Sequence, residues 1–179
     1  DFCEGKDVLD IACGEGYGAK LISKIASATT GVDISSEAID HASHKYGNTK
    51  LKFLVGSADK IPVGSNSIDV VVSFETIEHH DKHEEMFSEI KRVLRDDGVL
   101  IMSSPEKSIY HERDRNNPYH IKELTIDEFK QLANQHFKHC RFFTQKYIHG
   151  SLIEPINREK DDSGFQIFGG NYYNLSKSL

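Results

Sequence analysis

The sequence predicts an α/β protein, with a doubly wound, mostly parallel sheet covered by helices on both faces. Short apolar runs alternate with amphipathic stretches over the first hundred residues, which is typical of strand–helix–strand units. A glycine-containing loop at residues 14–16 directly follows the first apolar run. Folds that bind a nucleotide beyond their first strand carry glycines at this place.

Five short runs predict the strands of the sheet. The first ends in the glycine loop, and the β-branched character of the fourth indicates burial on both of its faces. The five runs comprise residues 8–12, 29–34, 51–55, 68–74 and 99–102.

The first two helices are predicted between these strands. Residues 17–26 place Leu21, Ile22 and Ile25 on one helical face, which we expect to be apolar and packed. Either Ser35 or Ser36 can cap the second helix, because a serine hydroxyl accepts a hydrogen bond from an amide of the first turn.

Capping signals mark two further helices. Asp81 with Glu84 three residues later resembles a capping pair, and residues 125–128 form a complete capping box. Beyond the second of these helices, residues 141–148 predict a strand, and a last strand is expected near residues 172–175.

Length and composition exclude several classes of protein. The 179 residues suit one domain, and the net charge of −6 disfavours a nucleic-acid partner because phosphates are repelled. No apolar run approaches the ~18–20 residues of a membrane helix. The cysteines form no CxxC pair, which favours a reducing, cytoplasmic setting; they are Cys3, Cys13 and Cys140.

An acid precedes the glycine loop. Asp10 lies at the end of the first strand, four residues before Gly14. A carboxylate at this point would repel the pyrophosphate of a dinucleotide, whereas it suits a ligand that carries a positive group.

Residues 8–16, VLDIACGEG, resemble the first motif of the class I S-adenosylmethionine-dependent methyltransferases, with Ala12 at a position that is usually glycine. The resemblance implies a Rossmann-like sheet of seven strands with an antiparallel C-terminal strand. It also implies S-adenosylmethionine as cofactor, with its methionine part held by the strand-end acid and the loop backbone, that is by Asp10, Ala12, Cys13, Gly14 and Gly16.

Four later segments extend the resemblance to about residue 105, and the last of them, residues 94–100, resembles the turn into the fifth strand with Asp96 and Asp97 in place of the usual Pro and Gly. In the second motif, Asp33 would hold the ribose hydroxyls, next to Ile34. In the third, Asp59 would face the adenine amino group, with Ala58 packing nearby. Phe74 ends the fourth strand, whose following loop would close over the methionine end of the cofactor.

The same family suggests what surrounds this sheet. A helical segment usually precedes the first strand, so we expect residues 1–179 to be one methyltransferase domain that lacks this cover. Residues 105–123 predict a long active-site loop. Residues 117–124 resemble a bacterial subgroup associated with glycan assembly, which implies a small-molecule or saccharide acceptor, methylated on oxygen.

A hydroxyl acceptor gains from a general base. The candidates are His79 and Glu75, after the fourth strand, and His120, in the long loop. His79 and His83 have the i, i+4 spacing of helical zinc ligands, but a helix starting at Asp81 leaves His79 outside it, so no metal site is expected.

Two alternatives remain open. A nicotinamide-dependent oxidoreductase or nucleotide-sugar epimerase could share this architecture, although Asp10 and the absence of a Tyr-x-x-x-Lys pair from any predicted helix count against it. A non-catalytic domain that binds the cofactor without transferring a methyl group would carry the same motifs.

Overall fold

A computed structural model describes residues 2–108, 117–148, 150–155 and 166–168. The chain divides into two compact units, with the division between His136 and Phe137. Among the described residues, no helix combines the length and the apolar character that crossing a membrane requires.

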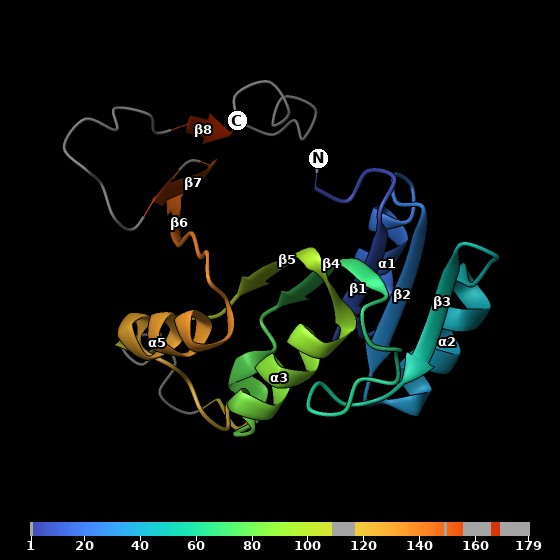
Figure 1. Ribbon diagram of the computed structural model, residues 1–179, viewed down its shortest axis with the longest axis horizontal. Coiled ribbons are helices and arrows are strands. Elements are labelled where there is room, and N and C mark those ends of the chain that lie inside the picture. The colour runs from blue at the N-terminus through green and yellow to red at the C-terminus, as the bar shows by residue number, and fades with distance from the viewer. Residues whose placement is uncertain (1, 109–116, 149, 156–165, 169–179) are drawn as a thin grey trace. The chain divides into compact units, whose positions relative to one another are not determined.

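The first unit is built on a five-stranded sheet in which every pair of neighbouring strands is parallel (Figure 1). The chain moves outward from β1 to β3 and then returns to the other side of β1, giving the order β3-β2-β1-β4-β5. The strands are β1 Asp7–Ile11, β2 Ala28–Asp33, β3 Leu51–Val55, β4 Ile68–Phe74 and β5 Leu94–Ser103.

The reversal of direction at β1 determines where a ligand can bind. In open α/β sheets the loops on the two sides of such a point diverge, which leaves a crevice outside the carboxyl ends of the strands. The register pairs Asp10 with Gly31 on one side of β1 and with Val72 on the other. The loops after β1, β2 and β4 therefore leave the sheet at one edge.

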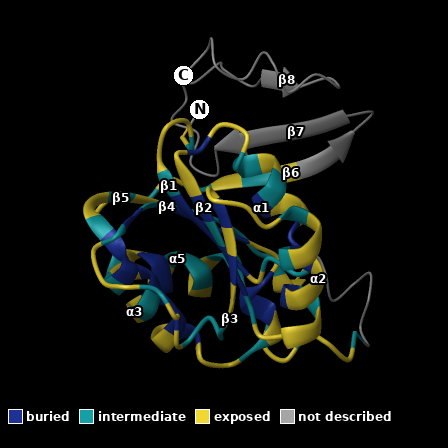
Figure 2. Ribbon diagram, turned by 90° about the vertical axis from the view of Figure 1, so that its right-hand side faces the viewer, coloured by how far each residue is buried: buried dark blue, intermediate teal, exposed yellow. Residues whose placement is uncertain are grey.

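Helices cover both faces of the sheet, with α1 and α2 on one side and α3 on the other (Figure 2). The α2 face buries a cluster of Ala19, Ile39, Ala42, Leu51 and Phe53. The helices are α1 Tyr17–Ile22, α2 Ser36–Tyr46, α3 His83–Val93 and α5 Ile126–His136, with a short 3₁₀ helix η1 at Ile77–His79.

Two of the predicted caps are confirmed. The hydroxyl of Ser35 accepts a hydrogen bond from the amide of Ala38 at 3.2 Å and begins α2. The capping box at α5 is reciprocal: the Glu128 amide donates to the Thr125 hydroxyl, and the Glu128 carboxylate accepts from the Thr125 amide.

Two details of the other helices differ from the prediction. Helix α1 ends at Ile22, which packs against the buried cluster of Val8, Ala26, Val70 and Val72. The side chains of Leu21 and Ile25 are instead 45% and 49% exposed, so only part of the predicted face is packed. Helix α3 begins at His83 behind Lys82, without a side-chain cap. Asp81 therefore does not cap it, because the N-cap position falls on Lys82, one residue later than the polar pattern indicates.

The fifth strand also begins earlier than predicted. β5 starts at Leu94, which pairs with Ile68, and the next pair joins Val99 to Val70. The intervening residues 95–98 bulge from the ladder. This irregular segment replaces the simple turn that Asp96, Asp97 and Gly98 predict.

The second unit contains an antiparallel sheet in the order β6-β7-β8. Its strands are β6 Phe143–Ile148, β7 Gly150–Pro155 and β8 Gln166–Phe168, and β6 matches the strand predicted at residues 141–148. The strand expected near residues 172–175 lies outside the described residues. A seven-stranded sheet with an antiparallel last strand is thus not confirmed, since five strands make the parallel sheet.

Phe87 tests the packing of α3 onto the sheet. Its side chain is fully buried and meets the ring of Phe129 edge to face at 6.4 Å between centroids. Phe87→Ala should lower the free energy of unfolding by about 3–5 kcal/mol, because it removes buried apolar surface and leaves a cavity. Urea unfolding followed by circular dichroism measures this.

Leu21→Ala is the matched control on α1. Its exposed side chain should contribute no more than about 0.5 kcal/mol. An effect as large as that of Phe87→Ala would contradict the packing described for α1.

Candidate functional site at the carboxyl edge of the sheet

The glycine loop after β1 turns through three left-handed residues, with φ of 58° at Ala12, 52° at Gly14 and 80° at Gly16. Glycine adopts this conformation without strain, which is the physical reason for the glycine usual at position 12. The amide of Cys13 donates to the carbonyl of Val32 at 3.0 Å, so the loop continues the pairing of β1 with β2.

Two glycines allow this loop to lie close to the core. A Cβ atom at Gly16 would stand 2.6 Å from the ring of Phe53, and one at Gly31 would stand 2.7 Å from the same ring and 2.8 Å from the sulfur of Cys13. Any larger side chain would push the loop away from the sheet. The sequence predicts Gly16 from the motif alone, and the structure shows the contact that requires it.

Asp33 joins the ends of β1 and β2. One of its carboxylate oxygens accepts from the Gly14 amide at 2.8 Å, and the other accepts from the Ser35 amide at 2.9 Å. The carboxylate is thus fixed between the glycine loop and the first turn of α2. Its partly exposed position leaves it able to accept hydrogen bonds from the hydroxyls of a bound ribose.

Asp10 makes this edge acidic and poorly hydrated. Its side chain is buried, and burial raises its pKa to about 7; the negative charge of Asp33 adds to the rise, and the Ala19 amide opposes it. Burial, followed by the same two carboxylates, raises the pKa of the Cys13 thiol to about 12. A cationic ligand suits such a site because it favours the ionised carboxylates.

The other predicted cofactor residues lie around the same edge. The apolar side chains of Ile34 and Phe74 are 76% and 55% exposed where β2 and β4 end, so each offers a surface for a flat ring. Ala58 is half-buried. Asp59 forms an ion pair with Lys82 at 2.7 Å, which holds the pKa of Asp59 at about 2 and keeps it ionised.

The three predicted general bases follow β4 or approach it. Glu75 has a left-handed φ of 50° and its carboxylate accepts from the hydroxyl of Ser103. His79 lies in η1, and its ring meets that of His120 edge to face at 5.2 Å between centroids. The structure thus brings together two histidines that are far apart in the sequence.

Sequence reasoning missed Glu78, which shares η1 with His79 and is fully buried. Burial, together with the charge of Glu75, raises its pKa. No periodicity marks Glu78 as buried because η1 is three residues long, too short for a helical pattern.

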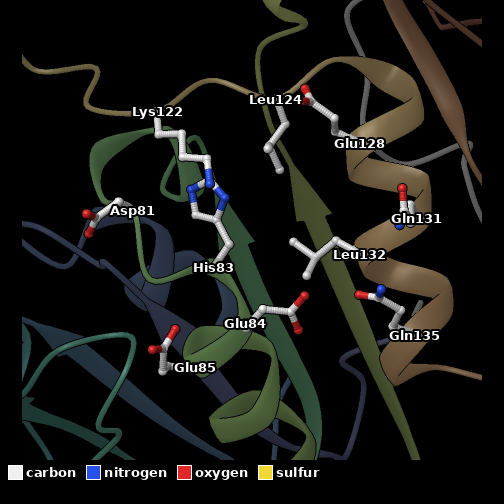
Figure 3. A pocket seen from close by; sticks show the side chains of 10 residues that line it. All are labelled: Asp81, His83, Glu84, Glu85, Lys122, Leu124, Glu128, Gln131, Leu132 and Gln135. Carbon is white, nitrogen blue, oxygen red and sulfur yellow. The ribbon is translucent and has the colours of Figure 1, made fainter.

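A separate groove of about 250 Å³ lies between the start of α3 and helix α5 (Figure 3). Its acidic lining includes Asp81, Glu84, Glu85 and Glu128. None of the predicted cofactor or catalytic residues lines it.

The sheet order, the glycine loop and the strand-end acids together define a Rossmann-like methyltransferase fold. The YcgJ protein of Bacillus subtilis has this fold, with a TM-score of 0.68 at 21% identity over 81% of this chain and 66% of that one. The family described as "Methyltransferase domain" matches residues 9–102, so the chain belongs to this family.

Curated relatives identify the class of cofactor. A "Probable S-adenosylmethionine-dependent methyltransferase" of Mycolicibacterium smegmatis is 37% identical over 132 residues, which are 73% of this chain and 51% of the relative. A fatty-acid O-methyltransferase of the same organism is 29% identical, over 55% of this chain and 36% of its own length. The resemblance to S-adenosylmethionine-dependent methyltransferases is confirmed, and the nicotinamide alternative is not favoured. The chain spans about half the length of the first of these relatives.

The raised pKa of Asp10 predicts an unusual pH dependence. The unfolded state ionises this carboxyl near 3.8 and the folded state near 7, so folding loses stability as pH rises through this window. Relative to Asp10→Asn, the wild type should lose on the order of 3 kcal/mol between pH 4 and pH 8. Urea unfolding at both values measures the difference.

The comparison with Asp10→Asn cancels the contributions of the other carboxylates, which both proteins share. If the free energy of unfolding depends on pH equally in the two proteins, the pKa of Asp10 is not raised in the folded state.

Proposed function

We propose that this chain binds S-adenosylmethionine at the carboxyl edge of the sheet and transfers its methyl group to a hydroxyl oxygen of a small-molecule or saccharide acceptor. The observation that carries the proposal is the junction of the glycine loop with Asp33, through the 2.8 Å hydrogen bond from Gly14. The hydrogen bond holds the Asp33 carboxylate beside the backbone amides of the glycine loop, at the crevice outside the carboxyl ends of the strands.

Each part of the cofactor has a complementary group at this edge. Asp33 would accept from both ribose hydroxyls, and Asp10 with the backbone of residues 12–16 would surround the positively charged methionine part. Ile34 would lie beside the ribose and Phe74 beside the methionine end, with Ala58 and Asp59 on the amino edge of the adenine. The Lys82 pair keeps Asp59 negatively charged and able to accept from that amino group.

Methyl transfer needs alignment more than chemical activation by the protein. The bound cofactor supplies a methyl group already activated on a sulfonium. The chain must hold the acceptor oxygen in line with that methyl group and receive the hydroxyl proton. Glu75, His79 and His120 stand after β4 or beside it, and we assign the proton to this group of side chains.

An oxygen acceptor agrees with the name of one relative, the fatty-acid O-methyltransferase. The resemblance of residues 117–124 to glycan-associated methyltransferases points to a hydroxylated small molecule or saccharide. We further propose that residues 105–123, of which 109–116 lie outside the described residues, border this acceptor, and that residues 1–179 belong to one methyltransferase domain.

Calorimetric titration tests cofactor binding. The wild type should bind S-adenosylmethionine and S-adenosylhomocysteine, and Asp33→Ala should weaken binding by about 1–3 kcal/mol, the cost of losing hydrogen bonds to a charged group. NAD should not bind.

Asp40→Ala is the matched control, because Asp40 is an exposed acid on α2. It changes the net charge equally and should leave cofactor affinity unchanged. Binding of NAD in place of S-adenosylmethionine would overturn the proposed function, and equal affinity of wild type and Asp33→Ala would remove Asp33 from the site.

A further inference from the structure

Glu78, His79 and His120 form a cluster in which one potential ligand atom from each side chain lies within 4.8 Å of the others. Glu78 and His79 belong to η1, whereas His120 comes from the segment that precedes α5. Two imidazoles and a carboxylate are a ligand set found at protein metal centres that keep a coordination position open.

Both histidines are held by their Nδ1 atoms. The Nδ1 of His79 lies 2.8 Å from the carbonyl oxygen of Tyr119, and the Nδ1 of His120 lies 2.6 Å from a carboxylate oxygen of Glu123. A carbonyl and an ionised carboxylate can only accept, so Nδ1 carries the proton in each ring and a neutral ring has its lone pair on Nε2. Metal-binding histidines are oriented by this kind of hydrogen bond.

Glu78 supplies a buried carboxylate, one oxygen of which has no hydrogen-bond partner among the described residues. Its side chain is 1% exposed, and its Oε2 atom has no hydrogen-bond partner there. Its Oε1 atom lies 3.9 Å from the Nε2 of His79. Buried carboxylates are normally paired with a positive charge or coordinated to a metal, and a cation between these groups would provide that charge.

The backbone fixes the two halves of the cluster against each other. The amides of Ile121 and Lys122 both donate to the carbonyl of Glu78, at 2.8 and 3.1 Å. The residue after His120 is therefore tied directly to the residue before His79. This arrangement assembles the three side chains without help from a ligand.

We propose that Glu78, His79 and His120 bind a divalent cation of the zinc class, with the histidines ligating through Nε2. Imidazole nitrogen favours zinc and its neighbouring transition metals over Mg²⁺ and Ca²⁺, which prefer oxygen. The i, i+4 pair of His79 and His83 is not the site. The Nε2 of His83 instead lies 2.7 Å from the carbonyl of His80.

This inference rests on the proposed function where it concerns the acceptor. Three protein ligands leave a position at which an acceptor oxygen can bind, and a bound cation lowers the pKa of a hydroxyl. The acceptor class then narrows to hydroxylated molecules that can ligate a cation, such as the vicinal diols of saccharides. Of the three predicted general bases, His79 and His120 are proposed ligands of the cation, and Glu75 is not.

Metal titration of the full chain tests the site. After treatment with EDTA, Zn²⁺ is added in competition with a chromogenic chelator, and Co²⁺ is added separately to record its visible absorption bands. The wild type should bind one equivalent of Zn²⁺. His120→Ala should weaken binding at least about 100-fold and abolish the Co²⁺ bands, because it removes a direct ligand.

Two further variants control this experiment. His44→Ala removes an exposed histidine of α2 and should bind as the wild type does. Glu123→Gln keeps the shape of the side chain that orients His120 and should weaken binding by about 10–100-fold. Circular dichroism verifies that each variant is folded. Absence of stoichiometric Zn²⁺ binding by the wild type, or equal affinity in His120→Ala and His44→Ala, would overturn the proposal.

Cofactor titration in the presence of EDTA separates this inference from the proposed function. Binding of S-adenosylhomocysteine without any binding of Zn²⁺ would overturn the metal site and leave the proposed function standing. Binding of Zn²⁺ without binding of S-adenosylhomocysteine would support the metal site and overturn the proposed function.

Discussion

The parallel pairing of β1 with both β2 and β4 is the constraint on which the rest of the first unit depends. It places the carboxyl ends of these three strands at one edge and makes their loops diverge there. Every residue assigned to the cofactor lies near the carboxyl end of one of these strands or in the segment after it or after the adjacent β3, and the loop that carries His79 follows β4. Two close approaches keep the edge compact, because Gly16 and Gly31 leave room for the ring of Phe53 beneath the loop.

The charges at this edge are placed at a cost to the folded protein. Burial of Asp10 beside Asp33 disfavours ionisation of Asp10 near neutral pH. A fold selected for stability alone would place an apolar side chain at the end of this buried strand. A bound cation stabilises the ionised form of this buried acid, and this stabilisation adds to the cation's binding energy. The arrangement therefore suits a site for a sulfonium and an ammonium.

The histidines show how much chemistry depends on a single backbone contact. The carbonyl of Glu78 accepts from two consecutive amides of a segment about forty residues away, and this contact brings His120 to His79. His79 lies in the three-residue helix η1 and His120 in an irregular segment, so no long helix or strand orients either ring. Their orientation instead follows from the Tyr119 carbonyl and the Glu123 carboxylate, each of which holds one Nδ1 atom. These same contacts determine which nitrogen of each ring can act on a ligand.

The sequence by itself determined the parallel core, four of the five strands within a residue or so, and the family. These depend on local patterns: β-branched runs, the glycine loop that ends β1, and caps such as Ser35 and Thr125, whose partners lie within three residues. The exposure of Leu21 and the start of α3 at His83 differ from what such patterns predict.

Only the tertiary structure decided which side chains meet. The sequence indicated His79 and His120 separately, and it did not mark Glu78 as buried between them. No local pattern encodes a contact made by two irregular segments, since such segments have no periodicity and their geometry depends on long-range hydrogen bonds. Asp33 belongs partly to each group. Its spacing from the glycine loop predicted a role at the ribose, but its hydrogen bond to Gly14 exists because β1 and β2 pair in register.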